Sequence, residues 1–185
     1  MIKINEYISF IPSTQEPLSS NVFFINGKNS TYIYDVGRND EAYNEIQNVA
    51  NNKTIVISHF HADHLSNITR ITYDDLYVSN YTYKHTNKGS IVKESITIKD
   101  DIKLEIISAS SVHSKGSLLL NINNEYCLIG DLIHYDGPLN KSLYCMMIKD
   151  LEKIDTKYFV LGHNENCIHS KDEFLVKLKQ KVTSI

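Results

Sequence analysis

The segment His59-Phe60-His61-Ala62-Asp63-His64, or HFHADH, decides how this chain is interpreted. It gathers three of the eight histidines and an aspartate into six residues. It directly follows Lys53–Ser58 (KTIVIS), an apolar run that is typical of a buried strand. Because α/β proteins place their sites at the carboxyl ends of such strands, the segment predicts a metal centre rather than exposed loop histidines.

The spacing within HFHADH indicates how the ligands divide. In an extended segment, residues two apart project to the same side, so His59 and His61 can bind one ion as a pair. Asp63 and His64 follow where the chain turns into a helix, so they point elsewhere and can hold a second ion. Imidazole and carboxylate groups suit Zn²⁺, iron or Mn²⁺ better than copper.

Further polar residues follow other predicted strands. Taken alone, His113, the Gly-Asp pair at Asp131 and the Gly-His pair at His163 could each be structural residues or turns. Their common position beside strand ends, in order after HFHADH, makes them candidate ligands as well.

Hydrophobic patterning predicts an α/β fold in which strand-rich halves alternate with helices. The predicted strands are Glu6–Ile11, Val22–Ile25, Thr31–Asp35, Lys53–Ser58, Leu76–Ser79, Ser95–Ile98, Lys103–Ser108, Ser117–Ile122, Glu125–Ile129 and Lys157–Leu161. The predicted helices are Asp40–Ala50, His64–Arg70, Tyr81–Thr86, Tyr144–Ile154 and a last helix that a capping box at Ser170–Glu173 opens and that runs through Val182. We therefore expect a four-layer αββα sandwich of two mixed β-sheets flanked by helices, in one domain over residues 1–185.

Composition excludes several classes of protein. The chain has a formal charge of -3 without a basic block, so we expect no general affinity for nucleic acid or anionic lipid. No run approaches the length of a membrane span, and the N-terminus lacks the features of a signal peptide. Three cysteines without CxxC spacing favour neither a disulfide framework nor a thiolate zinc site, so we expect a cytoplasmic protein. The oligomeric state cannot be predicted.

The order HxHxDH, then His, Gly-Asp and Gly-His at strand ends resembles the metallo-β-lactamase superfamily of metal-dependent hydrolases. The resemblance runs from about Asn21 to His163 and includes YDVG, which is similar to the family's IDTG segment. It implies two divalent metal ions, with zinc as the first choice and iron or manganese as alternatives. The implied ligands are His59, His61 and His113 for one ion, Asp63, His64 and His163 for the other, and Asp131 between both.

The resemblance also implies a mechanism in which two ions hold a hydroxide that attacks a carbonyl or phosphoryl centre. Asp63 would orient this hydroxide and accept its proton, and is therefore a candidate catalytic residue. His134 stands where related lactonases carry a tyrosine, so it is a candidate proton donor or anion binder on the substrate side. A solvated loop histidine is the alternative for His134.

The chain departs from the family's pattern around the third histidine. Where the family usually has PGHTPG, this chain has SVHSKGS, which puts the shape of that loop in doubt but not the ligand His113. Asp35 is equally well explained as an orienting partner of a ligand or as a plain strand-end residue. We expect Lys115 to be a solvated lysine, with contact to an anionic substrate as the alternative, and His85 and His169 to lie outside the centre.

The leading hypothesis is a binuclear metallo-hydrolase that cleaves a small thioester, lactone or phosphodiester. The alternatives are a nucleic-acid or nucleotide phosphodiesterase of the same superfamily, a redox di-iron protein, and a non-catalytic metal-binding module. An antibiotic-hydrolysing β-lactamase is disfavoured, since the dedicated enzymes are usually exported. The substrate itself is not readable from sequence.

Overall fold

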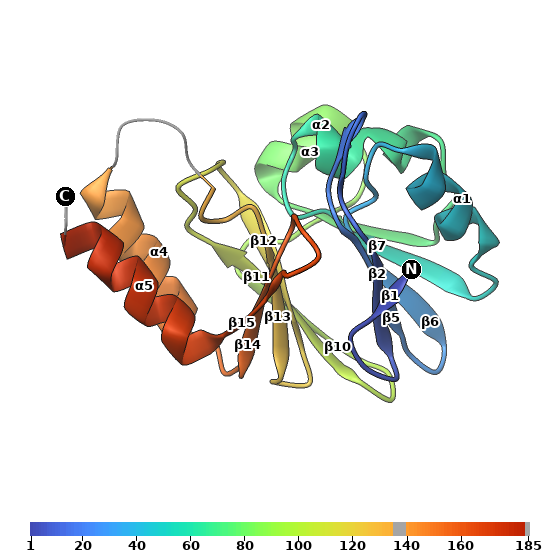
Figure 1. Ribbon diagram of the computed structural model, residues 1–185. Helices are drawn as coiled ribbons and strands as arrows, with labels where there is room; N and C mark the ends of the chain where they lie inside the picture. Colours follow the sequence, from blue (N-terminus) through green and yellow to red (C-terminus); the bar gives the residue numbers. More distant parts are fainter. Residues whose placement is uncertain (135–139, 184–185) are drawn as a thin grey trace.

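The computed structural model describes residues 1–134 and 140–183 and contains two large sheets that face each other (Figure 1). The first sheet has the strand order β1-β2-β5-β6-β7-β8-β9. Its strands are β1 (Ile2–Lys3), β2 (Ile8–Ile11), β5 (Val22–Asn26), β6 (Ser30–Tyr34), β7 (Asn52–Val56), β8 (Asp75–Val78) and β9 (Ser90–Ile91). Strands β6 to β9 pair in parallel and the others antiparallel, so the sheet is mixed.

The second sheet runs β10-β11-β12-β13-β14-β15 and is also mixed, because only β13 and β14 pair in parallel. Its strands are β10 (Ser95–Lys99), β11 (Lys103–Ala109), β12 (Ser117–Ile122), β13 (Tyr126–Gly130), β14 (Tyr158–Leu161) and β15 (Ile168–Ser170). A small hairpin of β3 (Thr14–Gln15) and β4 (Leu18–Ser19) precedes β5.

Helices cover the outer faces of both sheets. They are α1 (Asp40–Asn48), α2 (Ala62–Leu65), the 3-10 helix η1 (Ser66–Thr69), α3 (Asn80–Thr86), α4 (Lys141–Lys153) and α5 (Lys171–Thr183). Helices α4 and α5 lie against the second sheet, whereas α1 lies on the first (Figure 1). Among the described residues, no helix is both long enough and apolar enough to cross a membrane.

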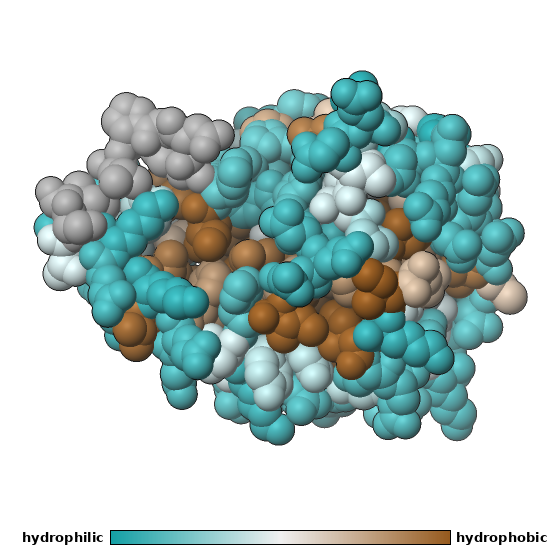
Figure 2. Space-filling model, viewed as in Figure 1, coloured by the Kyte–Doolittle hydropathy of each residue, from teal (hydrophilic) through white to brown (hydrophobic). Residues whose placement is uncertain are grey.

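Three apolar clusters account for the layers. The central cluster joins residues of the first sheet, such as Phe10 and Phe23, to residues of the second, such as Leu104 and Leu120. Separate clusters pack α4 and α5 on the second sheet and α1 with η1 on the first. Apolar side chains reach the surface in a band across the middle of the molecule, while hydrophilic groups dominate elsewhere on this face (Figure 2). The predicted αββα sandwich is confirmed.

Local capping sets where the helices begin. The side chain of Asn39 accepts a hydrogen bond from the amide of Ala42 at 2.8 Å and opens α1, whose buried side is Ala42 and Ile46. Asn140 caps α4 in the same way, so this helix begins three residues before the predicted Tyr144. The last helix buries the predicted stripe, Phe174, Leu175, Leu178 and Val182.

The helix predicted near His64–Arg70 is present, as the short α2 followed directly by η1. The backbone carbonyls of Asp63 and His64 do not continue a helix here. They accept hydrogen bonds from the amides of Ser20 at 3.0 Å and Val36 at 2.9 Å. The loops of the first sheet therefore end α2 after one turn and hold its residues in place.

Candidate metal centre

Seven candidate ligands from four loops meet at one edge of the two sheets. They form two groups, His59, His61 and His113 in the first and Asp63, His64, Asp131 and His163 in the second. Within each group, one ligand atom of every residue lies within 4.8 Å of the others. The seven residues predicted from the sequence are the same seven that the structure brings together.

The HFHADH segment divides between the two groups because of how the chain turns after β7. His59 is buried, and His61 has an extended backbone (φ −69°, ψ 148°) at the start of α2. Asp63 and His64 lie on α2 itself, so their side chains point to the second group. The divided arrangement predicted from the spacing therefore agrees with the geometry.

His113 is placed by a turn between β11 and β12. The hydroxyl oxygen of Ser111 accepts hydrogen bonds from the amides of His113 at 3.0 Å and Ser114 at 3.2 Å. Gly116 closes the turn with φ +74°. The SVHSKGS loop thus delivers the third histidine without the proline and glycine that the family usually has there.

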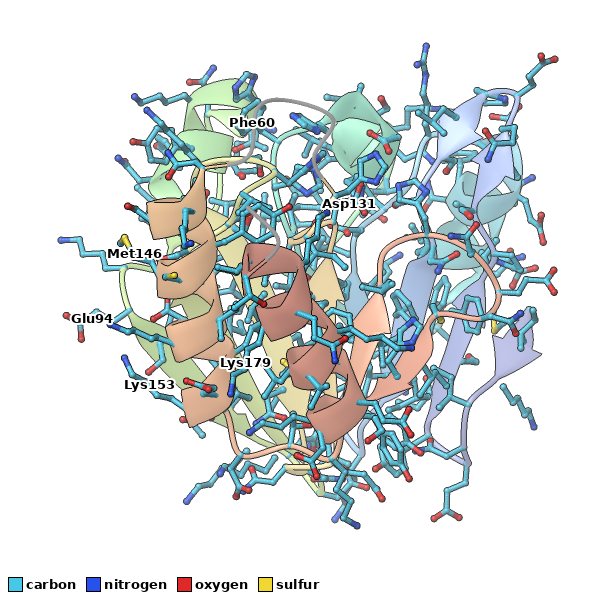
Figure 3. The ribbon with its side chains drawn as sticks, turned by 60° about the vertical axis from the view of Figure 1, so that its left-hand side comes forward. Phe60, Glu94, Asp131, Met146, Lys153 and Lys179 are labelled. Carbon is cyan, nitrogen blue, oxygen red and sulfur yellow. The ribbon has the colours of Figure 1, made fainter. Side chains whose placement is uncertain are left out.

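Asp131 lies between the two groups. Its Oδ2 is 3.4 Å from Nε2 of His64 and 3.3 Å from Nε2 of His163, and it is 3.8 Å from Nε2 of His113. A Cβ at Gly162 would lie 2.7 Å from Asp131 Oδ1, so the residue before His163 has no room for a side chain. Asp131 and Phe60 of HFHADH both lie in the upper half of the view, with Asp131 further inside (Figure 3).

Two observations show that the residues fit a metal ion. Nε2 of His64 is buried and makes no hydrogen bond, although its Nδ1 lies 2.7 Å from Asp35 Oδ2. In the first group, Nε2 of His113 lies 3.2 Å from Nε2 of His59 and 2.9 Å from Nδ1 of His61. Tetrahedral zinc with bonds near 2.05 Å separates its nitrogen ligands by about 3.3 Å, so this convergence suits such an ion.

The three histidines of the first group are held as neutral ligands. Burial and the nearby His64 lower the pKa of His59 to about 2. Burial and neighbouring imidazoles also lower the pKa of His61 and of His113, although Asp131 opposes this. Nitrogen lone pairs are therefore ready for a metal near neutral pH.

The second group is ionised. Burial alone would lower the pKa of His64, but Asp35 and Asp131 outweigh it and raise that pKa to about 10. Likewise Asp131 and Asp63 overcome burial and raise the pKa of His163 to about 9. The same contacts hold the pKa of both Asp63 and Asp131 below the ordinary range. Without metal, the positive charges of protonated His64 and His163 therefore balance the negative charges of the two carboxylates.

His134 lies at the rim of the first group. Its ring centroid is 5.8 Å from that of His113, its side chain is exposed, and it directly precedes residues 135–139, which lie outside the described part. Its backbone carbonyl accepts a hydrogen bond of 2.7 Å from Nδ1 of His113, which leaves Nε2 of that ring for a metal. The substrate-facing role of the His134 side chain stays a prediction.

Three residues that were expected to lie outside the centre join neither ligand group. His85 is exposed and stacks on Phe60, with ring centroids 4.7 Å apart and planes 2° apart. His169 lies beside Phe174 at 5.8 Å. Lys115 is exposed on the loop that carries His113.

Asp35 and Ser58 support the ligands from behind. Asp35 is fully buried with φ +60°, and its contact with His64 favours the orienting role over that of a plain strand-end residue. Ser58 was missed by the sequence analysis. Its hydroxyl oxygen lies 2.9 Å from Nδ1 of His59. The available signal was a small hydroxyl residue directly before the first histidine, at the end of a buried strand.

Comparison with known proteins gives the same family. The family model of the metallo-beta-lactamase superfamily matches residues 16–73, which include HFHADH. No curated protein matches the chain by sequence.

Solved structures extend the likeness over nearly the whole chain. A metallo-beta-lactamase from Pontibacter korlensis aligns with a TM-score of 0.70 and 16% identity, over 98% of this chain and 97% of that one. An archaeal metallo-beta-lactamase superfamily protein from Sulfolobus tokodaii aligns with a TM-score of 0.69 and 14% identity, over 95% of this chain and 86% of that one. The flavodiiron protein from Giardia intestinalis aligns with a TM-score of 0.77 and 11% identity. The alignment covers 99% of this chain but 59% of that one. At these identities the likeness shows the fold, and the family model matches the part of the chain that contains HFHADH.

Proposed function

We propose that this protein is a binuclear metal-dependent hydrolase that cleaves a small ester-like substrate: a thioester, a lactone or a phosphodiester. The observation that carries the proposal is the pair of ligand groups, with Asp131 between them and the buried Nε2 of His64 left without a hydrogen bond. A pair of divalent ions bound there supplies a nucleophile at neutral pH and polarises a substrate oxygen.

Each residue near the ions has a task that its environment supports. Asp63 stays ionised and partly accessible, so it is suited to accept the proton that the nucleophile loses. Asp131 keeps the two ions together. His134, exposed at the rim, is placed to donate a proton to the leaving group or to bind an anionic substrate group.

Zinc is the proposed metal, with iron and manganese as alternatives, because the same imidazole and carboxylate set accepts all three. The proposed partner is a small molecule, and nucleic acid or membrane is not expected. The cytoplasm is the proposed location, since all three cysteines are free thiols and two of them, Cys127 and Cys167, are buried.

The test combines metal analysis with a panel of chromogenic esters, lactones, thioesters and bis-phosphodiesters. Purified protein should bind two ions per chain and turn over at least one class. Asp63→Ala should lower kcat at least 100-fold, because it removes a ligand and the proton acceptor. Asp75→Ala is the matched control, since it removes an exposed carboxylate at the start of β8. Fewer than one bound ion, or equal turnover in both variants, would refute the proposal.

A redox di-iron protein is the second candidate, and one observation favours it: the fold of the Giardia flavodiiron protein aligns over 99% of this chain. The panel separates the two. Iron with a redox-dependent visible spectrum and no turnover of any ester would favour this candidate, whereas turnover with zinc would exclude it.

A further inference from the structure

The buried carboxylate of Asp35 contacts residues that serve both ligand groups. Its Oδ1 accepts a hydrogen bond from the amide of Ser58 at 2.7 Å. Its Oδ2 lies 2.8 Å from the Ser58 hydroxyl and 2.7 Å from Nδ1 of His64. All three side chains are at most 2% exposed, so water does not compete for these bonds.

The position of every proton in this network follows from counting donors. A carboxylate oxygen accepts hydrogen bonds, so the hydroxyl of Ser58 and Nδ1 of His64 both donate to Oδ2 of Asp35. Ser58 has a single hydroxyl proton and it is used there. The contact of 2.9 Å between Ser58 Oγ and Nδ1 of His59 therefore requires that His59 donates from Nδ1. The lone pair of His59 is left on Nε2, which faces His113.

We propose that Ser58 is a positioning residue that relays the hydrogen bonding of Asp35 to His59. Its hydroxyl donates to Asp35, and its oxygen therefore accepts from Nδ1 of His59 and orients that ring. One buried carboxylate then orients one histidine in each ligand group, directly for His64 and through Ser58 for His59. Metal binding at both sites depends on this one carboxylate, and this shared dependence is what couples the two sites. The coupling of metal binding rests on the function proposed above, whereas the orientation of His59 does not.

The surroundings hold Ser58 in this role. A Cβ at Gly130, which has φ +54°, would lie 2.9 Å from Cβ of Ser58 and 3.0 Å from its hydroxyl oxygen. The backbone carbonyl of Ser58 accepts a hydrogen bond of 2.8 Å from the amide of Leu118 in the second sheet. The serine is thus held between the sheets with its hydroxyl directed at Asp35 and His59.

The first test is direct and needs no metal. Long-range ¹H–¹⁵N spectra of the metal-free protein report which nitrogen of His59 carries the proton. Wild type should show His59 protonated at Nδ1, and Ser58→Ala should show a mixture of both forms. In Asp35→Asn the amide nitrogen replaces Oδ2 and donates to Ser58, whose hydroxyl then donates a hydrogen bond to Nδ1 of His59, so the neutral His59 ring should carry its proton on Nε2. Asparagine tolerates the left-handed backbone at this position.

The second test measures zinc affinity at each site by chelator competition. Ser58→Ala should weaken the first group by about 10- to 100-fold and the second by less than threefold, because only His59 loses its partner. Asp35→Asn should weaken both. Since Ser58 acts through Asp35, adding Ser58→Ala to Asp35→Asn should change the first group by less than threefold. Ser9→Ala, which alters a buried hydroxyl bonded to Met1, is the control and should change neither.

Three results would overturn the relay: an unchanged His59 tautomer in both Ser58→Ala and Asp35→Asn, an unchanged first-group affinity in Ser58→Ala, or a Ser58→Ala effect as large in Asp35→Asn as in wild type. A wild type that binds no zinc would overturn the proposed function and the coupling. The spectra of the metal-free protein would still decide whether Ser58 orients His59, so the two failures are distinguishable.

Discussion

Metal binding at the two ligand groups should differ sharply in its dependence on pH. In the second group the pKa of His64 is about 10 and that of His163 about 9, so both rings are protonated near neutral pH. A metal ion must displace one proton from each ring, while both carboxylates are already ionised. In the first group the pKa of His59 is about 2, and the other two rings also have lowered pKa values.

The magnitude follows from this proton count. Because two protons leave per ion, the affinity of the second group should rise about 100-fold for each pH unit, until pH approaches the pKa of His163. A lower pH weakens this group since protons compete with the metal for the same nitrogens. The pKa values of the three rings in the first group are lowered, so this group should release fewer protons and its affinity should depend less on pH than that of the second group.

Calorimetric titration of metal-free protein with Zn²⁺, in buffers of different ionisation enthalpy between about pH 6 and 7, counts the released protons. We expect two protons per ion for the second group and fewer for the first. His85→Ala is the control, because it removes a histidine outside both groups and should leave the count unchanged. Release of less than one proton for the second group, or the same pH slope for both groups, would refute the reasoning.

Three further predictions concern the support of the centre. Gly162→Ala would place a Cβ 2.7 Å from Asp131 Oδ1, so it should lower metal content by at least one ion per chain, as measured by elemental analysis. Asn21 is buried and its amide donates to the carbonyls of Leu161 at 3.3 Å and Asn164 at 2.9 Å. Asn21→Ala should therefore lower the free energy of urea unfolding by about 1–3 kcal/mol, and an unchanged midpoint would contradict this. Metal removal by a chelator should lower stability by about 4 kcal/mol for each ion lost if zinc is present at 1,000 times its Kd, which a drop of roughly 10 °C in Tm per ion would report.

The ligands could be predicted from sequence because each follows a strand whose own pattern is strong. The apolar run ending at Ser58 predicts a buried strand, and the end of such a strand fixes where His59 lies. The short strands β1, β9 and β15 were not predicted, since two or three residues carry no periodicity and form only by pairing with a neighbour. The same holds for the hairpin of β3 and β4.

Other features depend on contacts that no local pattern contains. The early end of α2 depends on carbonyls that bond to Ser20 and Val36, which lie far away in the sequence. The role of Ser58 depends on which way one hydroxyl points, and that is set by Asp35. Sequence reasoning thus located the side chains that would touch a metal but not the one that fixes a ligand's tautomer.

The two ligand groups meet the same electrostatic problem in different ways. In the second group a divalent ion replaces two protons, so its charge is compensated before and after binding. In the first group three neutral imidazoles receive an ion without giving up a proton, so the added charge must be balanced from outside the group. Asp131 does this from one side, at 3.8 Å from Nε2 of His113. Asp35 contacts His64 of the second group directly and reaches the first group only through Ser58, so in the proposed relay the same buried carboxylate contributes negative charge behind both groups.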